Sequence, residues 1–526
     1  METTQNLNLP RASTPGEAGI SRQVLARMMQ DVTDEGLELH SVMVVRRGQV
    51  AYEQFRRPYG PNEPHTLFST SKSITSIAVG FAVEEGRLRL DDKVADLVPE
   101  LRDFPHENWE RLQVAHLLRM SAGKSLNYLV DKRKKQWVRD FARGEWLYAP
   151  GEGWHYCNEN CYMLCVILQR LYNESVVDFL MPRLFEPLGI ERPFWETDGC
   201  GVETGGWGLY LRTEDLAKIG LCYLNEGKYR GRQVIPAAWV RESSRAQTDT
   251  ADNNGENGRY GYGYGFWMNP PPGGFRMDGL FAQFLFLLPE YDACIVTTGG
   301  EGVMHNVLNA VFRHLPALFE QEDDAPCDIP VLPEYPPLPA SPRNAAQEER
   351  IEGRFIRFLS ATQHFPKAVG FPLSVIPGMI FFMSADKAGG IDCVRLRFGA
   401  DSVKFSWSEG SERNTVLCGM DGRPRKCKIT LGGVPFILSC SAAWEGDRLQ
   451  LRLRCLTSVA ERRLTFRFRG RAVSMLPRSA PGLDCLRADS EQFARDNIPL
   501  HLSDRFITGA VDTVLWLVEP QLIGYW

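Results

Sequence analysis

The sequence has no long hydrophobic run and no strong excess of charge of either sign. No run of about 18 consecutive apolar residues occurs, which argues against a membrane-spanning helix. The formal net charge is −5 at pH 7, and the isoelectric point is near 6.1. Such a balance provides no general attraction to nucleic acid or acidic membranes, and we expect neither as a partner.

A secretory signal and a disulfide pattern are also missing. The first ten residues, METTQNLNLP, are polar and contain no basic stretch followed by an apolar core. The 13 cysteines are an odd number scattered over 526 residues, whereas disulfide scaffolds are short chains with paired cysteines. We therefore expect free thiols in a reducing cytoplasm.

The length of 526 residues exceeds what one compact domain normally holds, so at least two domains are expected. Seven of the seventeen residues in 326–342 are prolines, and an acidic stretch precedes them. This composition is typical of an extended, semi-rigid linker. We predict a first domain over residues 1–320, a linker over 321–346 and a second domain over 347–526.

Hydrophobic spacing in the first domain predicts an α+β fold. Apolar residues recur at helical spacing in 21–37, 69–86 and 303–319, and strand-like runs cover 40–45, 49–55, 262–268, 275–277, 281–288 and 293–298. Because strands lie at both ends and helical segments lie between them, we expect an antiparallel sheet flanked by helices with an inserted helical region.

The second domain has a different pattern. The runs RLQLRLRCL at 448–456 and RLTFRFRG at 463–470 alternate strictly between arginine or polar residues and apolar residues. A period of two indicates strands with one buried face, so the arginines should line the solvated face. We predict an antiparallel β domain, either a barrel or a sandwich.

The segment with the clearest chemical meaning is Ser69-Thr70-Ser71-Lys72. Residues three apart on a helix share a face, so Lys72 can reach back to the Ser69 hydroxyl. A serine needs a neighbouring base to become a nucleophile, and a buried lysine with a lowered pKa can be that base. Free N–H groups at a helix start could also stabilise an oxyanion.

The spacing S-x-x-K is weak evidence on its own, because it also occurs at Ser121/Lys124 and Ser384/Lys387. Ser69 differs from these because it opens a long amphipathic helix. Ser121/Lys124 straddles Gly123 in a loop-like stretch, and Ser384/Lys387 lies beside two glycines in the β-rich region. The sequence therefore favours the first pair.

A second element is Tyr156-Cys157-Asn158, which follows a loop around Pro150-Gly151. A loop tyrosine can exchange protons with a serine–lysine pair, and an amide two residues later can orient the lysine and a substrate carbonyl. Alternatively, Tyr156 is a packing residue and Asn158 caps the following helix.

Together these motifs resemble those of the class C β-lactamase-like and penicillin-binding-protein-like serine hydrolases. The resemblance covers about residues 15–320 and rests on FSTSK at 68–72, VAHLLRMSAG at 114–123, YCN at 156–158 and GWGLY at 206–210 followed by DLA at 215–217. This family includes esterases, D-aminopeptidases and 6-aminohexanoate-oligomer hydrolases. The resemblance implies Ser69 as nucleophile, Lys72 as its proton acceptor, Tyr156 as proton shuttle and Asn158 as the orienting amide.

The third motif departs from the family pattern. The matching stretch is RMDGLF at 276–281, where Met277 replaces the usual basic residue and Gly279 fits. The N–H groups of Leu280 and Ser69 could still form the oxyanion hole, because a backbone donor needs no particular side chain. Asp278 either faces the cleft and favours substrates with an amine or hydroxyl group, or satisfies local backbone donors.

Two other groups of residues carry structural interpretations. Cys157, Cys161 and Cys165 are four residues apart with no nearby histidine, which fits small buried residues better than a zinc site. The basic run at 132–135 is typical of a solvated face. No metal or cofactor is expected.

The resulting hypothesis is a serine hydrolase that acts on a small ester or amide through an acyl-enzyme at Ser69. One alternative is an acyltransferase or transpeptidase, or a β-lactamase or DD-peptidase on the same fold. Another is a non-catalytic binding protein, which the altered third motif permits.

Overall fold

A computed structural model describes residues 8–125, 136–251, 258–271, 273–320, 325–359, 391–409, 412–480 and 521–526. The chain divides into two compact units, of which the first extends to Pro333 and the second begins at Glu334. The basic run at 132–135 and the Ser384/Lys387 pair lie outside the described residues.

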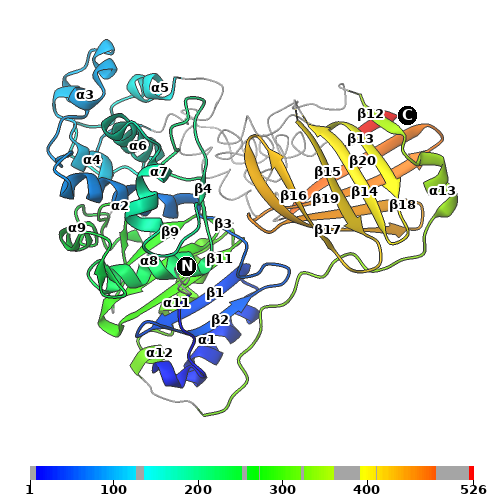
Figure 1. Cartoon of the computed structure of the whole chain (residues 1–526), viewed down its shortest axis with the longest axis horizontal. Coiled ribbons are helices and arrows are strands. Elements are labelled where there is room, and N and C mark those ends of the chain that lie inside the picture. The colour runs from blue at the N-terminus through cyan, green and yellow to red at the C-terminus, as the bar shows by residue number, and fades with distance from the viewer. Residues whose placement is uncertain are drawn as a thin grey trace, which may run out of the picture. The chain divides into compact units, whose positions relative to one another are not determined.

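The first unit is built on a six-stranded antiparallel sheet (Figure 1). The strand order is β2 (Gln49–Phe55), β1 (Leu39–Arg46), β11 (Ala293–Gly299), β10 (Gln283–Leu288), β9 (Phe275–Gly279) and β8 (Trp267–Met268). The pairing of β1 with β11 joins segments about 250 residues apart. The α+β prediction, with an inserted helical region between distant strands, is confirmed.

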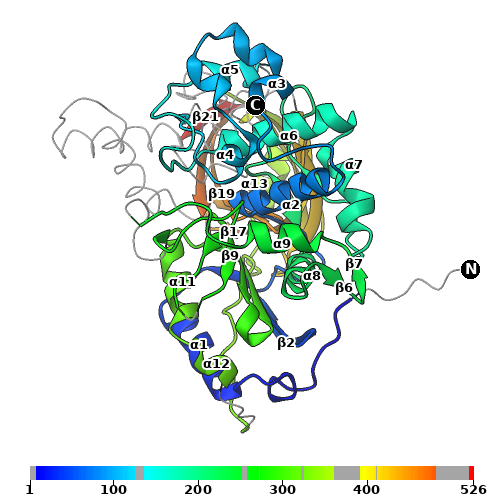
Figure 2. The same cartoon turned by 90° about the vertical axis from the view of Figure 1, so that its left-hand side faces the viewer.

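Helices cover both faces of this sheet. Helices α1 (Arg22–Asp34), α11 (Met304–Phe312) and α12 (Ala317–Glu320) share one apolar core with alternate residues of the strands (Figure 2). Helix α8 (Thr213–Leu224) packs against the other face, where a Cβ at Gly220 would lie 2.9 Å from Leu285 Cδ1. Strands β1, β10 and β11 are therefore buried along their whole length and form a rigid support.

The inserted region supplies most of the helices. Its described α-helices before α8 are α2 (Ser71–Glu84), α3 (Val94–Leu97), α4 (Val114–Leu118), α5 (Trp137–Arg143), α6 (Asn158–Tyr172) and α7 (Val176–Leu180), and α9 (Ala237–Ser243) follows it. Three short strands, β3 (His65–Thr66), β5 (Leu209–Leu211) and β4 (Phe194–Trp195), form a small sheet in the order given. A hairpin of β6 (Lys228–Tyr229) and β7 (Arg232–Gln233) follows α8.

Three predicted elements differ from the observed ones. The expected helix over 303–319 is divided into α11 and α12, because Pro316 lacks the N–H that a continuous helix requires. The strand expected over 281–288 begins only at Gln283, since Phe281 and Ala282 have φ of 64° and 67°. The run 262–268 contributes only β8, and Gly265 with φ of 82° lies in the preceding loop.

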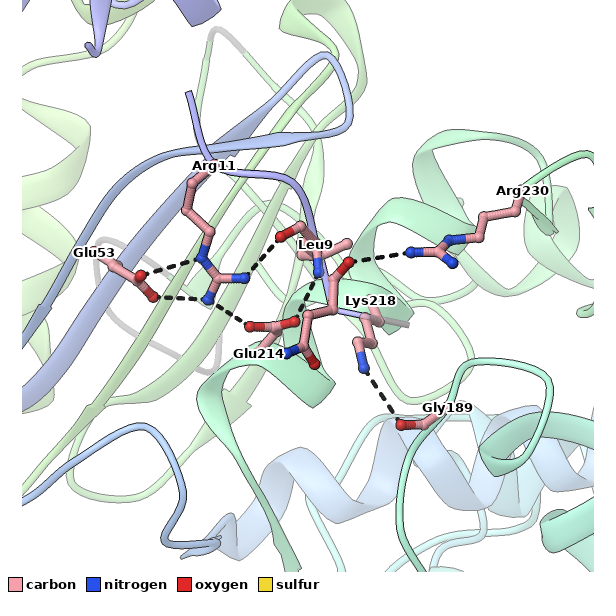
Figure 3. A network of polar contacts seen from close by, with 8 residues as sticks. Leu9, Arg11, Glu53, Gly189, Glu214, Lys218 and Arg230 are labelled. Atoms are coloured by element: carbon pink, nitrogen blue, oxygen red, sulfur yellow. Dashed lines mark hydrogen bonds and ion pairs between the residues drawn. The ribbon is translucent and has the colours of Figure 1, made fainter. Parts of the chain in front are cut away.

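The N-terminal segment pairs with the backbone of Val50 on β2 and is further held by the Arg11 side chain (Figure 3). The Arg11 guanidinium donates to both oxygens of Glu53 on β2, at 3.2 and 3.1 Å, and to Glu214 on α8, at 2.5 Å. Glu214 also accepts the N–H of Leu9, and the Leu9 carbonyl accepts from Arg11. These contacts connect the segment to elements on both sides of it.

The proline-rich segment packs against the two units instead of running free between them. Residues 325–344 contain no helix or strand. Leu332 is buried in the core of the first unit, and its N–H donates to Gln54 Oε1 at 3.1 Å. Leu338 is buried in the second unit, where its N–H donates to Ser441 Oγ at 3.0 Å. Each half of the segment is thus attached to its own unit; the domain limits at 320 and 347 remain predictions.

The second unit is a β-barrel preceded by α13 (Ala345–Ile351). Its described strands are β12 (Phe355–Phe358), β13 (Ile391–Phe398), β14 (Ser402–Glu409), β15 (Glu412–Gly419), β16 (Arg425–Leu431), β17 (Val434–Glu445), β18 (Arg448–Cys455), β19 (Glu461–Arg469), β20 (Ala472–Ala480) and β21 (Leu522–Tyr525). The sheet closes where Gly419 on β15 pairs with Ser441 on β17. The predicted alternation is confirmed for Leu449, Leu451 and Leu453, which are buried while Arg448 is exposed. The prediction that the arginines line the solvated face is wrong for Arg454, which is buried because it pairs with the buried Glu461 at 2.5 Å.

Candidate active site

Ser69 lies in a short 3-10 turn, Phe68–Thr70, that leads directly into α2. Phe68 has a φ of 45°, a left-handed conformation that is uncommon outside glycine. Ser69 is partly exposed, whereas Phe68 and Thr70 are buried. Helix α2 is itself buried from Ser71 to Ala82, so the serine is a reachable hydroxyl on a rigid support.

Lys72 meets the Ser69 side chain as its position on the next turn requires. Its Nζ donates to Ser69 Oγ at 2.7 Å and to the Gly206 carbonyl at 2.8 Å, and the residue is 2% exposed. Burial lowers the pKa of Lys72 from 10.5 to about 8, and the nearby Glu159 offsets part of this effect. About a tenth of the amine is then uncharged at pH 7, against roughly one part in 3,000 for an ordinary lysine.

The Gly206 carbonyl reaches Lys72 because two glycines lie against the start of α6. A Cβ at Gly205 would lie 2.4 Å from the Cys161 carbonyl oxygen, and one at Gly206 would lie 2.9 Å from the carbonyl oxygen of Asn158. Thr75 on α2 holds the same loop through a hydrogen bond to the Gly205 carbonyl at 2.8 Å. Sequence reasoning missed this acceptor, since a backbone carbonyl has no side-chain signature.

Tyr156 comes from the loop before α6 and converges on the same pair. Lys72 Nζ lies 4.7 Å from the centroid of its ring, and Ser69 is near enough to the phenol to lower its pKa. Burial is the main cause that raises the pKa of Tyr156, so the phenol carries its proton at neutral pH. Three aromatic rings surround it: Trp267 stacks at 5.8 Å, and Trp154 and Tyr262 lie at 6.1 and 6.3 Å.

Asn158 is the first residue of α6 and is partly exposed. Within the described part of the chain, the two hydrogen bonds of Lys72 Nζ go to Ser69 and Gly206, and neither goes to Asn158. The helix has no side-chain cap bond at its preceding residue, Cys157. The orienting role of Asn158 toward lysine and substrate remains a prediction.

The end of β9 is held against the serine turn. A Cβ at Gly279 would lie 2.3 Å from the Leu67 carbonyl oxygen and 2.9 Å from Thr70 Oγ1, so only glycine fits there. Thr70 Oγ1 donates to the Gln283 carbonyl at 2.7 Å, which connects the serine turn to β10. Gly279 thus acts by allowing the close approach of two backbones.

Two backbone donors lie at this junction. Over the described residues, neither the N–H of Ser69 nor that of Leu280 is hydrogen-bonded to a protein acceptor. Ser69 is the second residue of the 3-10 turn and Leu280 follows the last residue of β9, so both N–H groups remain outside the regular pairing. Two unpaired donors beside a nucleophile are what an oxyanion hole requires.

Asp278 lies on β9 and is paired with a buried cation. Arg276 Nε donates to Asp278 Oδ2 at 2.9 Å, with side-chain exposures of 2% and 12%. The Arg276 guanidinium also donates to the Met268 carbonyl at 3.1 Å. Asp278 lies close enough to Lys72 and Tyr156 to raise the pKa of both. Its carboxylate is therefore part of the site's electrostatics while largely neutralised by Arg276.

The second S-x-x-K match does not form a pair. Ser121 Oγ accepts a hydrogen bond from Arg119 Nε at 2.9 Å. Lys124 Nζ instead donates to the carbonyls of Ala142 and Gly144. Three aromatic ring centroids lie near this Nζ, those of Trp146 at 4.4 Å, Trp109 at 5.1 Å and Phe141 at 5.6 Å. Lys124 is a structural cation that fixes the loop after α5.

The three spaced cysteines are buried and protonated. Burial raises the pKa of Cys161 to about 12, and the thiol of Cys157 donates to Glu159 Oε2 at 3.2 Å. In the described segments, no group of three or more histidine, cysteine or acidic side chains could hold a metal ion. The same part of the chain contains no helix that is both long and apolar enough to span a membrane.

Comparison with known families agrees with this geometry. A sequence model of the beta-lactamase family matches residues 25–301, more than half of the chain. The chain belongs to the beta-lactamase family. The match contains Ser69, Lys72, Tyr156 and the end of β9, and it ends before the barrel.

Individual relatives are distant. The chain is 26% identical to a 6-aminohexanoate-dimer hydrolase from Paenarthrobacter ureafaciens over 58% of this chain and 86% of that protein. It is 29% identical to penicillin-binding protein 4* from Bacillus subtilis over 26% of this chain and 31% of that protein. A solved structure titled as a putative 6-aminohexanoate-dimer hydrolase from Bacillus anthracis is 20% identical, covers 55% of this chain and 80% of its own, and has a TM-score of 0.47. Membership of the beta-lactamase family supports hydrolase activity for this chain.

Proposed function

We propose that this protein hydrolyses a small ester or amide through a covalent acyl intermediate on Ser69. The observation that carries the proposal is the 2.7 Å contact between Ser69 Oγ and the Nζ of a lysine whose pKa is lowered to about 8. A charged lysine could not accept the serine proton, and burial makes the uncharged form accessible near neutral pH.

Each residue of the site has its own role in the proposed reaction. Uncharged Lys72 accepts the proton of Ser69 as Oγ attacks the substrate carbonyl carbon. The N–H groups of Ser69 and Leu280 stabilise the resulting oxyanion. Tyr156 gives its proton to the leaving group and regains one from Lys72, which fits a phenol that is protonated at rest. Water then attacks the carbonyl carbon of the acyl-enzyme. The same groups move the protons in the opposite direction, so that Ser69 regains its proton and the acid is released.

The surroundings favour an uncharged, apolar group next to the reacting carbonyl. Trp154, Tyr262 and Trp267 form a partly buried cluster beside Tyr156. Arg276 already neutralises Asp278, so a substrate ammonium would gain little there. We propose a small ester or amide as the substrate class, with Asn158 contacting its carbonyl.

A cytoplasmic location is proposed on thiol chemistry. The twelve cysteines of the described chain are all free, and eight of them are buried. Several buried thiols have a raised pKa, which keeps them protonated and slow to oxidise. Such a set is compatible with a reducing compartment.

The direct test is intact-mass spectrometry of the full chain after exposure to esters, D-amino-acid amides and β-lactams. We expect an acyl adduct on the peptide that contains Ser69, none in Ser69→Ala, and an unchanged adduct in Ser121→Ala, which removes the serine of the unpaired motif. Absence of adduct and turnover over the whole panel would refute catalysis and support a binding protein. Product analysis with added alcohols or amines separates hydrolysis from acyl transfer.

A further inference from the structure

The turn that joins β9 to β10 has an unusual backbone. It consists of Leu280, Phe281 and Ala282, and the last two residues have φ of 64° and 67°. A left-handed conformation is unfavourable for a non-glycine residue, because its Cβ approaches the following carbonyl oxygen. Two such residues in succession persist only where neighbouring groups hold them.

Gln283 is the group that holds this turn. Its side chain is fully buried, and its Nε2 donates to the carbonyls of Leu280 at 3.1 Å, Phe281 at 2.9 Å and Gly299 at 2.8 Å. Its Oε1 accepts the N–H of Gly299 at 3.2 Å. The two Nε2 hydrogens of Gln283 are thus shared among three carbonyl acceptors, and its Oε1 accepts a hydrogen bond as well.

These bonds fix the turn against β11, the buried strand that contains Gly299. Thr297 on the same strand adds a bond from its hydroxyl to the Ala282 carbonyl at 2.8 Å. On the other side, the Phe281 ring packs against the Phe68 ring at 5.4 Å, and Thr70 donates to the Gln283 carbonyl. The turn is thereby connected to both residues that flank Ser69.

We infer that Gln283 is a positioning residue for the oxyanion hole, acting by fixing the Leu280 backbone relative to Ser69. The inference rests on the proposed function. Gln283 does not touch the reacting atoms; it orients the peptide that follows the Leu280 N–H. Burying an amide costs free energy unless its hydrogen bonds are made, and all four bonds of the Gln283 amide go to the backbone of this turn and of Gly299.

The test compares Gln283→Leu and Gln283→Met with Gln233→Leu. Gln233 also bonds two carbonyls, those of Glu226 and Ile235, in the exposed hairpin after α8, so its variant removes an amide clamp away from the site. Methionine is unbranched and adaptable, which gives a second variant if leucine does not fold. Each protein is first checked by circular dichroism and thermal unfolding.

The readout is the rate for an ester and for the matching thionoester, in which sulfur replaces the carbonyl oxygen and accepts hydrogen bonds weakly. We expect kcat for the ester to fall about 10- to 100-fold with KM within about threefold, because one of two donors is misplaced. The thionoester rate should fall less than about threefold, so the ratio of the two rates drops.

Two outcomes overturn the inference: ester and thionoester rates that fall by the same factor, which indicates a general structural role, or variants that keep the wild-type ratio. Both differ from failure of the proposed function, in which the wild-type chain itself turns over no ester and forms no adduct on Ser69; that result removes the inference as well. Gln233→Leu should retain the wild-type ratio.

Discussion

Replacing Lys72 with methionine should abolish activity and change how stability depends on pH. Burial lowers the pKa of Lys72 from 10.5 to about 8, so the charged form is disfavoured in the folded protein by about 3 kcal/mol. Below pH 8 both the folded and the unfolded chain bind this proton, and the full cost is present. Between pH 8 and 10.5 only the unfolded chain binds it, so the wild-type protein gains stability as pH rises.

Methionine has a similar length and no charge, so Lys72→Met removes this cost and also gives up the hydrogen bonds to Ser69 and Gly206. At about 1 kcal/mol per bond, we expect the variant to be more stable than the wild type at pH 7 by about 1 kcal/mol. The advantage should reverse as pH rises, with the difference changing by about 3 kcal/mol between pH 7 and 11.

The assay is urea unfolding of both proteins at several pH values, with kcat measured in parallel. Lys124→Met is the matched control: burial also lowers the pKa of Lys124 to about 8, so it should show the same pH-dependent stability while keeping its activity. A stability difference between wild type and Lys72→Met that stays flat from pH 7 to 11 would refute the claim of a buried amine with a lowered pKa.

Three further predictions concern single positions. Asp278→Asn removes a charge that raises the pKa of Lys72, so the acid limb of the profile of kcat/KM against pH should move to lower pH, by less than about one unit because Arg276 offsets most of that charge. Gly279→Ala places a Cβ 2.3 Å from the Leu67 carbonyl oxygen, so kcat should fall at least about 100-fold. Glu461→Ala leaves buried arginine charge unpaired in the barrel and should lower its unfolding free energy, measured in urea, by about 3–5 kcal/mol.

Each of these has a control. For Asp278→Asn, an acid limb that moves to higher pH would contradict the expected effect of the Asp278 charge on Lys72. The control is Glu445→Gln on the barrel, which should not move the acid limb. For Gly279, the control is Gly399→Ala, where the nearest atom to a Cβ lies at 3.4 Å, and equal losses in both variants would contradict the proposed crowding. If Glu461→Ala unfolds at the same urea concentration as the wild type, the pairs of Glu461 with Arg454 and Arg463 contribute nothing to stability.

The alternating and helical periods of the sequence were enough to predict the fold class. Burial on one face of a strand or helix leaves a period that can be read locally, as in β18 and α1, and burial on both faces of a strand leaves a short apolar run, as in β1. The turn at Phe281 and Ala282 was not predicted, because it is stabilised by the side chains of Gln283 on β10 and Thr297 on β11, and local propensity does not register such bonds.

For the candidate site, the sequence by itself determined that Ser69 and Lys72 could meet, because residues three apart in a helical segment share a face. It could also name Tyr156, through its motif. Only the tertiary structure decided which S-x-x-K is a pair, that the Gly206 carbonyl holds the lysine, and that Arg276 neutralises Asp278. These depend on backbone groups and burial contributed by distant segments, and no short stretch of residues contains that information.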